Sequence, residues 1–214
     1  MFIDVYADKY QQFQGFKITL IGKHNKLIPA HMSFEQSTRS TYDIAMRDAT
    51  IDALVTMEDL SLLEPGQIFY KDIAPTEMYI VQSINKTEQQ IKSKNINAIK
   101  QNCYVSLERL KYNEETGKEE FEEIYKDIIS FASLQNKDEK NFAAGAEENT
   151  NINIQIPKIN VSEDYSYIVK QLDRIIIKNL KGDRMDNVKV ESVDEYGVPG
   201  VIRIYGTFDT RTGE

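Results

Sequence analysis

Apolar and polar residues alternate over short stretches along most of the chain, the pattern of strands with one buried face. Residues 16–22 alternate in this way, and residues 26–34 predict a return strand after the turn-like residues 23–25. Residues 151–157 alternate strictly, and residues 201–208 predict a closing strand. The pattern therefore predicts a mainly β protein.

A hairpin unit occurs twice in the sequence. In the first copy QIFYK (67–71) precedes a loop and MYIVQSIN (78–85), and in the second LDRIIIK (172–178) precedes a loop and VKVESVD (188–194). Each copy has an apolar triplet ending in Lys, and a strand closing on Gln/Glu-Ser-Ile/Val-Asn/Asp. Because Ile68 and Ile175 are 175 − 68 = 107 residues apart, a domain-scale distance, the repeat predicts a chain of small β modules.

A long hairpin is predicted between the two copies. Residues 103–112 and 119–131 flank the turn 113–118, in which Gly117 can adopt the positive φ that such a turn needs. The composition of residues 119–131 also allows a helix, but the glycine turn and the alternation in the partner strand favour the hairpin.

Three segments give weaker patterns. Residues 40–51 are compatible with a short helix capped by Ser40 or Thr41, and residues 51–57 with a strand. The polar residues 86–101 indicate a surface loop or a short helix. Ser162, with acidic residues nearby, can cap a single helical turn.

A polar segment predicts the domain boundary. Residues 135–150 are mostly Asn, Lys, Asp, Glu, Ala and Gly, too polar to bury much surface, and indicate a linker or mobile loop. We therefore expect an N-terminal mainly β domain over residues 1–134 and a small C-terminal β-barrel over residues 151–214. The predicted fold class is mainly β, with small β-barrel or sandwich modules, long hairpins and one or two short helices.

Composition narrows the possible partners. The formal net charge of −8 argues against a broad basic surface for nucleic acid. Cys103, the one cysteine, lies between apolar neighbours, which predicts a small buried residue and a reducing compartment. No apolar run is long enough to span a membrane, and the first residues lack the pattern of a secretory signal.

The sequence offers little catalytic chemistry. His24 and His31 can approach each other across a hairpin, but no Cys or acidic cluster joins them at metal-ligand spacing. Neither histidine has a nucleophile-elbow context, and no phosphate-binding glycine motif occurs. The glutamates of residues 114–123 indicate a solvated hairpin face. We therefore predict no catalytic residue, no metal site, no cofactor and no enzyme activity.

The second hairpin copy resembles a known pattern. Leu172-Asp173-Arg174-Ile175 followed by VKVESVD is similar to the "G-D-R-I … Y-x-V-x-S-I" pattern of head-closure and related connector proteins in tailed-bacteriophage necks. The strand at 123–131 after an acidic turn also resembles strands of phage virion proteins. Leu172 stands where that pattern often has Gly, and Asn187-Val188 where an aromatic residue is common.

The resemblance implies a structural virion protein, made in the host bacterial cytoplasm, that forms a homo-oligomeric ring in the head–tail connector. Its implied partners are the portal or adaptor protein and the tail tube or tail terminator protein, with DNA only passing through the lumen and no membrane. An acidic chain suits such a lumen, because negative walls repel phosphates. Another tail component, a tail terminator or baseplate protein, is the alternative, and a soluble enzyme with an acidic site is a more distant one. The candidate lumen or inter-subunit loop residues are Asn113, Glu114, Glu115, Thr116, Gly117, Lys118, Lys181, Gly182, Asp183 and Arg184.

Overall fold

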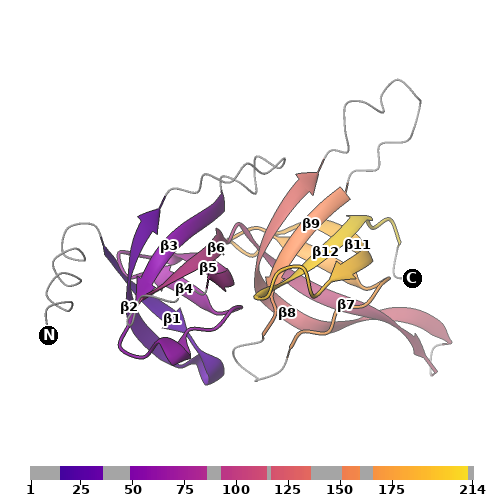
Figure 1. The fold of residues 1–214 in the computed structure, drawn as a ribbon. Helices are drawn as coiled ribbons and strands as arrows, with labels where there is room; N and C mark the ends of the chain where they lie inside the picture. Colours follow the sequence, from indigo (N-terminus) through magenta and orange to yellow (C-terminus); the bar gives the residue numbers. More distant parts are fainter. Residues whose placement is uncertain are drawn as a thin grey trace, which may run out of the picture. The chain divides into compact units, whose positions relative to one another are not determined.

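The computed structural model describes residues 15–35, 49–85, 93–114, 117–135, 151–159 and 166–211. Strands dominate these residues, so the predicted mainly β fold class is confirmed. The strands form two closed barrels (Figure 1). Two short 3₁₀ turns are present among the described residues, η1 (Lys23–Asn25) and η2 (Leu60–Leu62).

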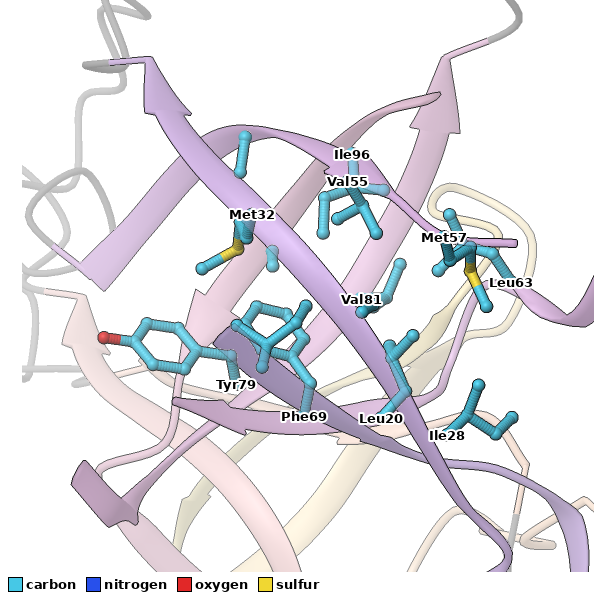
Figure 2. Packing of buried hydrophobic residues seen from close by; sticks show 14 residues of the cluster. Leu20, Ile28, Met32, Val55, Met57, Leu63, Phe69, Tyr79, Val81 and Ile96 are labelled. Carbon is cyan, nitrogen blue, oxygen red and sulfur yellow. The ribbon is translucent and has the colours of Figure 1, made fainter. Parts of the chain in front are cut away.

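The first barrel closes six antiparallel strands in the ring order β1-β2-β3-β6-β5-β4. Its interior is filled by the inward residues of these strands, among them Leu20, Met32 and Phe69, with Phe69 stacked on Tyr79 at 5.1 Å between ring centroids (Figure 2). The strands are β1 (Phe16–Ile21), β2 (Leu27–Glu35), β3 (Thr50–Thr56), β4 (Ile68–Lys71), β5 (Ala74–Asn85) and β6 (Ser93–Lys100).

The second barrel repeats this topology. Its ring order is β10-β11-β12-β9-β8-β7. If β7 to β12 are matched in sequence to β1 to β6, this order becomes β4-β5-β6-β3-β2-β1, which is the order of the first barrel in the opposite direction. The predicted hairpin copies are β4–β5 and β10–β11, so they occupy equivalent places in the two barrels. The strands are β7 (Cys103–Asn113), β8 (Lys118–Gln135), β9 (Asn151–Pro157), β10 (Arg174–Lys178), β11 (Arg184–Asp194) and β12 (Val201–Phe208).

The repeated sequence motif marks β-bulges. In β5 the register shifts between Val81 and Ser83, and in β11 it shifts between Val190 and Ser192. A second shift occurs just before the Lys that ends β4 and just before the Lys that ends β10. Bulges bend a strand and increase its twist, which closing a small barrel requires. The sequence repeat thus encodes the bends at which both barrels close.

A small residue faces each Gln/Glu-Ser bulge. Ala98 lies opposite Val81, and Gly206 lies opposite Val190. A Cβ atom on Gly206 would lie 2.4 Å from the carbonyl oxygen of Lys189 and 2.5 Å from a methyl carbon of Val188. The bulged β11 therefore approaches β12 too closely for any side chain at position 206.

Several predicted strands and turns are confirmed, and one segment differs. The strands predicted at 16–22, 26–34, 151–157 and 201–208 match β1, β2, β9 and β12. Residues 93–100, expected in a loop or short helix, form β6, because Ile96 and Ile99 are fully buried and the amide of Asn97 donates to Asp52 at 2.6 Å. The strand alternative for 51–57 matches β3.

The predicted helix at 40–51 falls mostly on residues outside the described part of the chain, as do the linker at 135–150 and the cap at Ser162.

The compact units do not follow the predicted domain boundary. One unit comprises Met1–Gln101, Pro157–Tyr167 and Val198–Val201, and the other comprises the rest. Residues 102–134, expected in the N-terminal domain, supply β7 and β8 of the second barrel. The polar segment after Gln135 joins β8 to β9, which are antiparallel neighbours, so it connects two strands of one barrel.

We predict that Gly206→Ala lowers the free energy of unfolding by about 3 kcal/mol, because the new methyl group must displace the backbone of the bulge. Gly182→Ala is the matched control, since Gly182 has a φ of +91° but no atom within 4 Å of an added Cβ. That control should lose only about 1 kcal/mol, from backbone strain alone. Urea unfolding measures both variants, and equal losses would contradict the close approach at the bulge.

Candidate functional site

The β7–β8 hairpin extends beyond the second barrel as a two-stranded arm. β10 pairs with β7 only as far as Glu108, and β9 pairs with β8 only from Phe131 onward. We call residues 109–114 and 117–123 the arm, and Figure 1 shows its strands leaving the barrel. The long hairpin is thus confirmed in place of the alternative helix, and Gly117 adopts the predicted positive φ of 68°.

The two faces of the arm differ in chemistry. On one face Arg109 lies opposite Glu122 and Lys111 opposite Glu120, and Lys111 forms an ion pair with Glu122. On the other face Leu110 lies opposite Phe121 and Tyr112 opposite Glu119. The side chain of Tyr112 is 65% exposed and that of Leu110 36% exposed. The arm therefore presents a charged face and a face with exposed apolar groups.

Asp173 holds the charged face of the arm at its base. The Arg109 guanidinium donates to both carboxylate oxygens of Asp173, at 2.8 and 2.7 Å, and also to the carbonyl oxygen of Ile168 at 3.1 Å. The same carboxylate accepts the backbone N–H of Lys170 at 2.7 Å. The hydrogen bond to Asp173 raises the pKa of Arg109, so the guanidinium keeps its charge in this bidentate contact.

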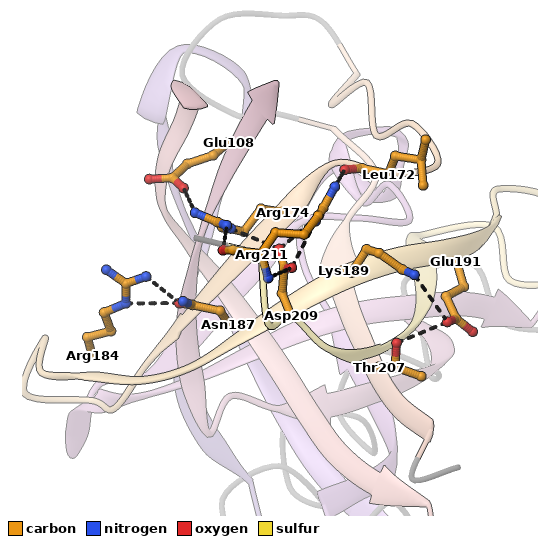
Figure 3. A network of polar contacts seen from close by, with 10 residues as sticks. All are labelled: Glu108, Leu172, Arg174, Arg184, Asn187, Lys189, Glu191, Thr207, Asp209 and Arg211. Carbon is orange, nitrogen blue, oxygen red and sulfur yellow. Dashed lines mark hydrogen bonds and ion pairs between the residues drawn. The ribbon is translucent and has the colours of Figure 1, made fainter. Parts of the chain in front are cut away.

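Arg174, the next residue, holds the opposite face. Its guanidinium carbon lies 3.4 Å from the centroid of the Phe121 ring, and its Nε donates to Asp209 at 2.9 Å. A further hydrogen bond reaches the carbonyl oxygen of Arg211, and Glu108 forms an ion pair at 3.7 Å (Figure 3). Because successive residues of a strand point to opposite sides, Asp173 and Arg174 clamp the arm from both faces.

Asp209 is the central anion of this network. Its side chain is 1% exposed, and it accepts hydrogen bonds from Arg174 and from Arg211. Burial acts to raise the pKa of Asp209, but the hydrogen bonds from Arg211 and Arg174 outweigh it and hold the pKa well below its usual range. The network is fully paired, which suits a structural role more than proton transfer.

The second candidate loop is well ordered by its own hydrogen bonds. The side-chain oxygen of Asn179 accepts the backbone N–H groups of Lys181 and Asp183, at 2.9 and 3.0 Å. The Asn179 amide donates to the Asp183 carboxylate, and the Arg184 guanidinium donates to Asn187 at 2.6 and 2.9 Å. We call residues 179–185 the tip loop, and its fixed backbone exposes both cations, Lys181 and Arg184.

The two candidate loops lie at opposite ends of the second barrel. The tip loop follows Lys178, which lies opposite Tyr104 at the start of β7. The arm turn follows Asn113, which is nine residues further along the same strand, or roughly 30 Å at the usual rise per residue. Residues 113, 114, 117 and 118 are described in the arm turn, and Glu115 and Thr116 lie outside the described part.

Other candidate groups are not brought together. His24 lies in η1 with a φ of 54°, and His31 lies well along β2, opposite Lys17. Burial raises the pKa of the Cys103 thiol to about 12, so this predicted core residue stays protonated. Within the described ranges, no group of three or more His, Cys, Asp or Glu residues could hold a metal ion. The described residues also include no helix long and apolar enough to cross a membrane.

The residues that partner Asp173 and Arg174 were not predicted. Arg109, Phe121, Asp209 and Arg211 lie between 35 and 64 positions from their partners in the sequence. The local alternation of apolar and polar residues around these positions does not reveal pairs so distant in the sequence. No protein family, curated protein or solved structure matches the chain.

Leu172 occupies a position that suits glycine. Its φ is 73°, and its N–H donates to the carbonyl oxygen of Val190, as the N–H of Gly66 donates to that of Val81 in the first barrel. Gly66 has a φ of 91°, so the two residues are equivalent in the repeat. The Leu172 side chain is 58% exposed and contributes little to the core.

We predict that Leu172→Gly raises the free energy of unfolding by about 0.5 kcal/mol, because relief of left-handed strain exceeds the added entropy of the unfolded chain. Leu180→Gly is the control, since Leu180 is similarly exposed, at 53%, but has no positive φ. That control should lose up to about 1 kcal/mol. Denaturant unfolding of dilute protein measures both, and a loss for Leu172→Gly as large as that of the control would refute the strain.

We predict that Asp209→Asn lowers the free energy of unfolding at pH 7 by about 3 kcal/mol, because two guanidinium groups lose their buried counter-charge. The folded pKa lies below the unfolded value of about 3.9, so the stabilisation is present above about pH 4 and is lost as the pH falls through the folded pKa. The difference between wild type and variant should therefore shrink on acidification, which urea titrations from pH 7 to pH 2.5 would follow.

The matched control for Asp209→Asn is Glu122→Gln, which breaks the exposed pair with Lys111. That variant should lose less than about 1 kcal/mol. If both variants lose the same amount and have the same pH dependence, the buried network is not what fixes the base of the arm.

Proposed function

We propose that this protein is a structural virion protein of a tailed bacteriophage, one that forms a ring in the head–tail connector. In this role it joins the portal or adaptor protein to the tail and lines or gates the DNA channel. The observation that carries the proposal is the arm, which leaves a closed barrel and exposes apolar side chains at Leu110 and Tyr112.

The arm supports assembly because its two strands extend past the last residues at which β10 and β9 pair with them. Closure pairs every strand of each barrel with two neighbours, which removes the free edges of an open sheet. Beyond Glu108 the described ladders give the arm strands only each other as partners. A two-stranded ribbon is marginally stable alone, so an arm of this length is best explained by contact with another molecule.

The clamp at the base of the arm supports the same role. Asp173 and Arg174 carry the resemblance to connector proteins, and they hold Arg109 and Phe121 on opposite faces of the arm. An arm fixed at its base loses less entropy on binding than one that swings freely. The resemblance and the geometry therefore point to the same pair of residues.

The excess of acidic residues supports a channel through which DNA passes without binding. The chain has 26 basic and 34 acidic residues, and four glutamates lie at exposed positions among residues 119–123 of the arm. Negative walls repel phosphates, so DNA can pass without binding.

We predict that the full-length protein forms a closed ring at high concentration or on a portal or adaptor ring. Native mass spectrometry and negative-stain imaging of the protein alone, and then with purified portal or adaptor, would detect it. Binding to a tail tube or tail terminator protein without binding to the portal side would favour the alternative of another tail component. A protein that stays monomeric in every mixture would contradict the proposal.

A further inference from the structure

We infer that copies of this chain join head to tail, with the arm of one copy bound to the tip loop of the next. This inference rests on the proposed function, since it names the contact from which the ring would be built. It concerns the second barrel alone, which carries both elements.

The positions of the two elements exclude a contact within one copy. β7 runs from Tyr104, beside the tip loop, to Asn113, beside the arm turn, so the strand separates the two elements. A rigid strand of this length, clamped by Asp173 at the arm base, cannot fold back on its own barrel. A contact between arm and tip loop must therefore join two different copies.

Exposed apolar side chains are present at both elements. In the tip loop Leu180 is 53% exposed and Met185 60% exposed, and in the arm Tyr112 is 65% exposed. Tyr and Met are enriched in the buried centres of protein interfaces. Burial of these side chains against each other would supply the apolar part of the contact.

The charges of the two elements are complementary. The arm, residues 109–114 and 117–123, contains three basic and five acidic side chains, for a net charge of 3 − 5 = −2. The tip loop exposes Lys181 and Arg184, while its one carboxylate, that of Asp183, accepts a hydrogen bond from Asn179. Glu119 and Glu123 are exposed on the same arm face as Tyr112, where Lys181 and Arg184 of a neighbouring copy can reach them.

The symmetry of such a contact determines the assembly. Because two different surfaces meet, the contact is heterologous and leaves a free arm at one end and a free tip loop at the other. Repetition closes into a ring where the rotation allows it. The order of the tip loop supports this use, since a preorganised loop loses little entropy on binding.

Two variants test the inference by blocking one surface each. Tyr112→Asp places a charge in the apolar part of the arm, and Met185→Asp does the same in the tip loop. Each variant alone should self-associate at least about tenfold more weakly than wild type, in analytical ultracentrifugation or native mass spectrometry. A mixture in equal amounts should form a dimer and nothing larger, because one intact arm meets one intact tip loop.

The control variant is Ile73→Asp, at an apolar residue of the first barrel that is 75% exposed. It should associate like wild type, and unfolding curves should show that all three variants are folded. If the wild type assembles and the two blocked variants assemble equally well, this contact is wrong while the proposed ring stands. If the folded variants stay monomeric when mixed, the contact is not head to tail. A wild-type protein that stays monomeric both alone and in mixtures with a portal or adaptor ring would overturn both proposals.

Discussion

Closure of a small antiparallel sheet into a barrel is the constraint on which this structure depends. Six strands can close only if some of them bend sharply, and in both halves of the chain β-bulges supply the bends. The extra residue is Gln82 in β5 and Glu191 in β11, each followed by Ser. The strand opposite must come close at that point, which explains Ala98 in one barrel and Gly206 in the other.

Closure also determines where the arm begins. Paired strands of equal length would end together, but β7 and β8 are longer than the strands beside them and leave the barrel as a ribbon. Such a ribbon keeps its direction only if its base is held on both faces. Two consecutive residues of β10 and its lead, Asp173 and Arg174, provide this hold, because a strand directs them to opposite sides.

The sequence predicted the parts of the fold that local patterns encode. Alternation located most of the strands, and the hairpin repeat located equivalent positions in the two barrels. The predicted domain boundary differs from that of the compact units. Composition shows only that residues 135–150 are polar. A polar connection between neighbouring strands of one barrel has the same composition as a linker between domains. The sequence does not predict β6, because its lysines and asparagines give the segment the polar composition of a loop although Ile96 and Ile99 are buried.

For a related reason, the sequence predicts only part of the candidate site. Both candidate turns were located from Gly, Asn and charged residues, which favour turns locally. Their separation to opposite ends of the barrel depends on the pairing of β10 with β7, between residues that are some 70 positions apart. The same pairing brings Arg109 and Phe121 to Asp173 and Arg174, while the pairing of β12 with β11 brings Asp209 and Arg211 there. All of these pairings are long-range, so no local pattern could have revealed the partners.

Comparison of the two barrels explains why the arm belongs to the second. Gly66, Gln67 and Ile68 in the first barrel correspond to Leu172, Asp173 and Arg174 in the second, as the backbone bonds to Val81 and Val190 show. The structural equivalent of Ile68 is thus Arg174, one residue before the Ile175 that the sequence repeat matches to it.

In the first barrel Ile68 is buried, and Gln67 bonds within its own turn, to the carbonyl oxygen of Leu62 and the N–H of Glu64. In the second barrel the equivalent positions carry charges that are just as buried and reach out to the base of the arm. A buried charge costs stability unless it is paired, so a closed barrel alone has no need of Asp173 and Arg174. The first barrel has Gln67 and Ile68 at these two positions. The arm explains why the second barrel has Asp173 and Arg174 there, because these two charged residues hold its base. The function of this chain is therefore to be sought where its two barrels differ.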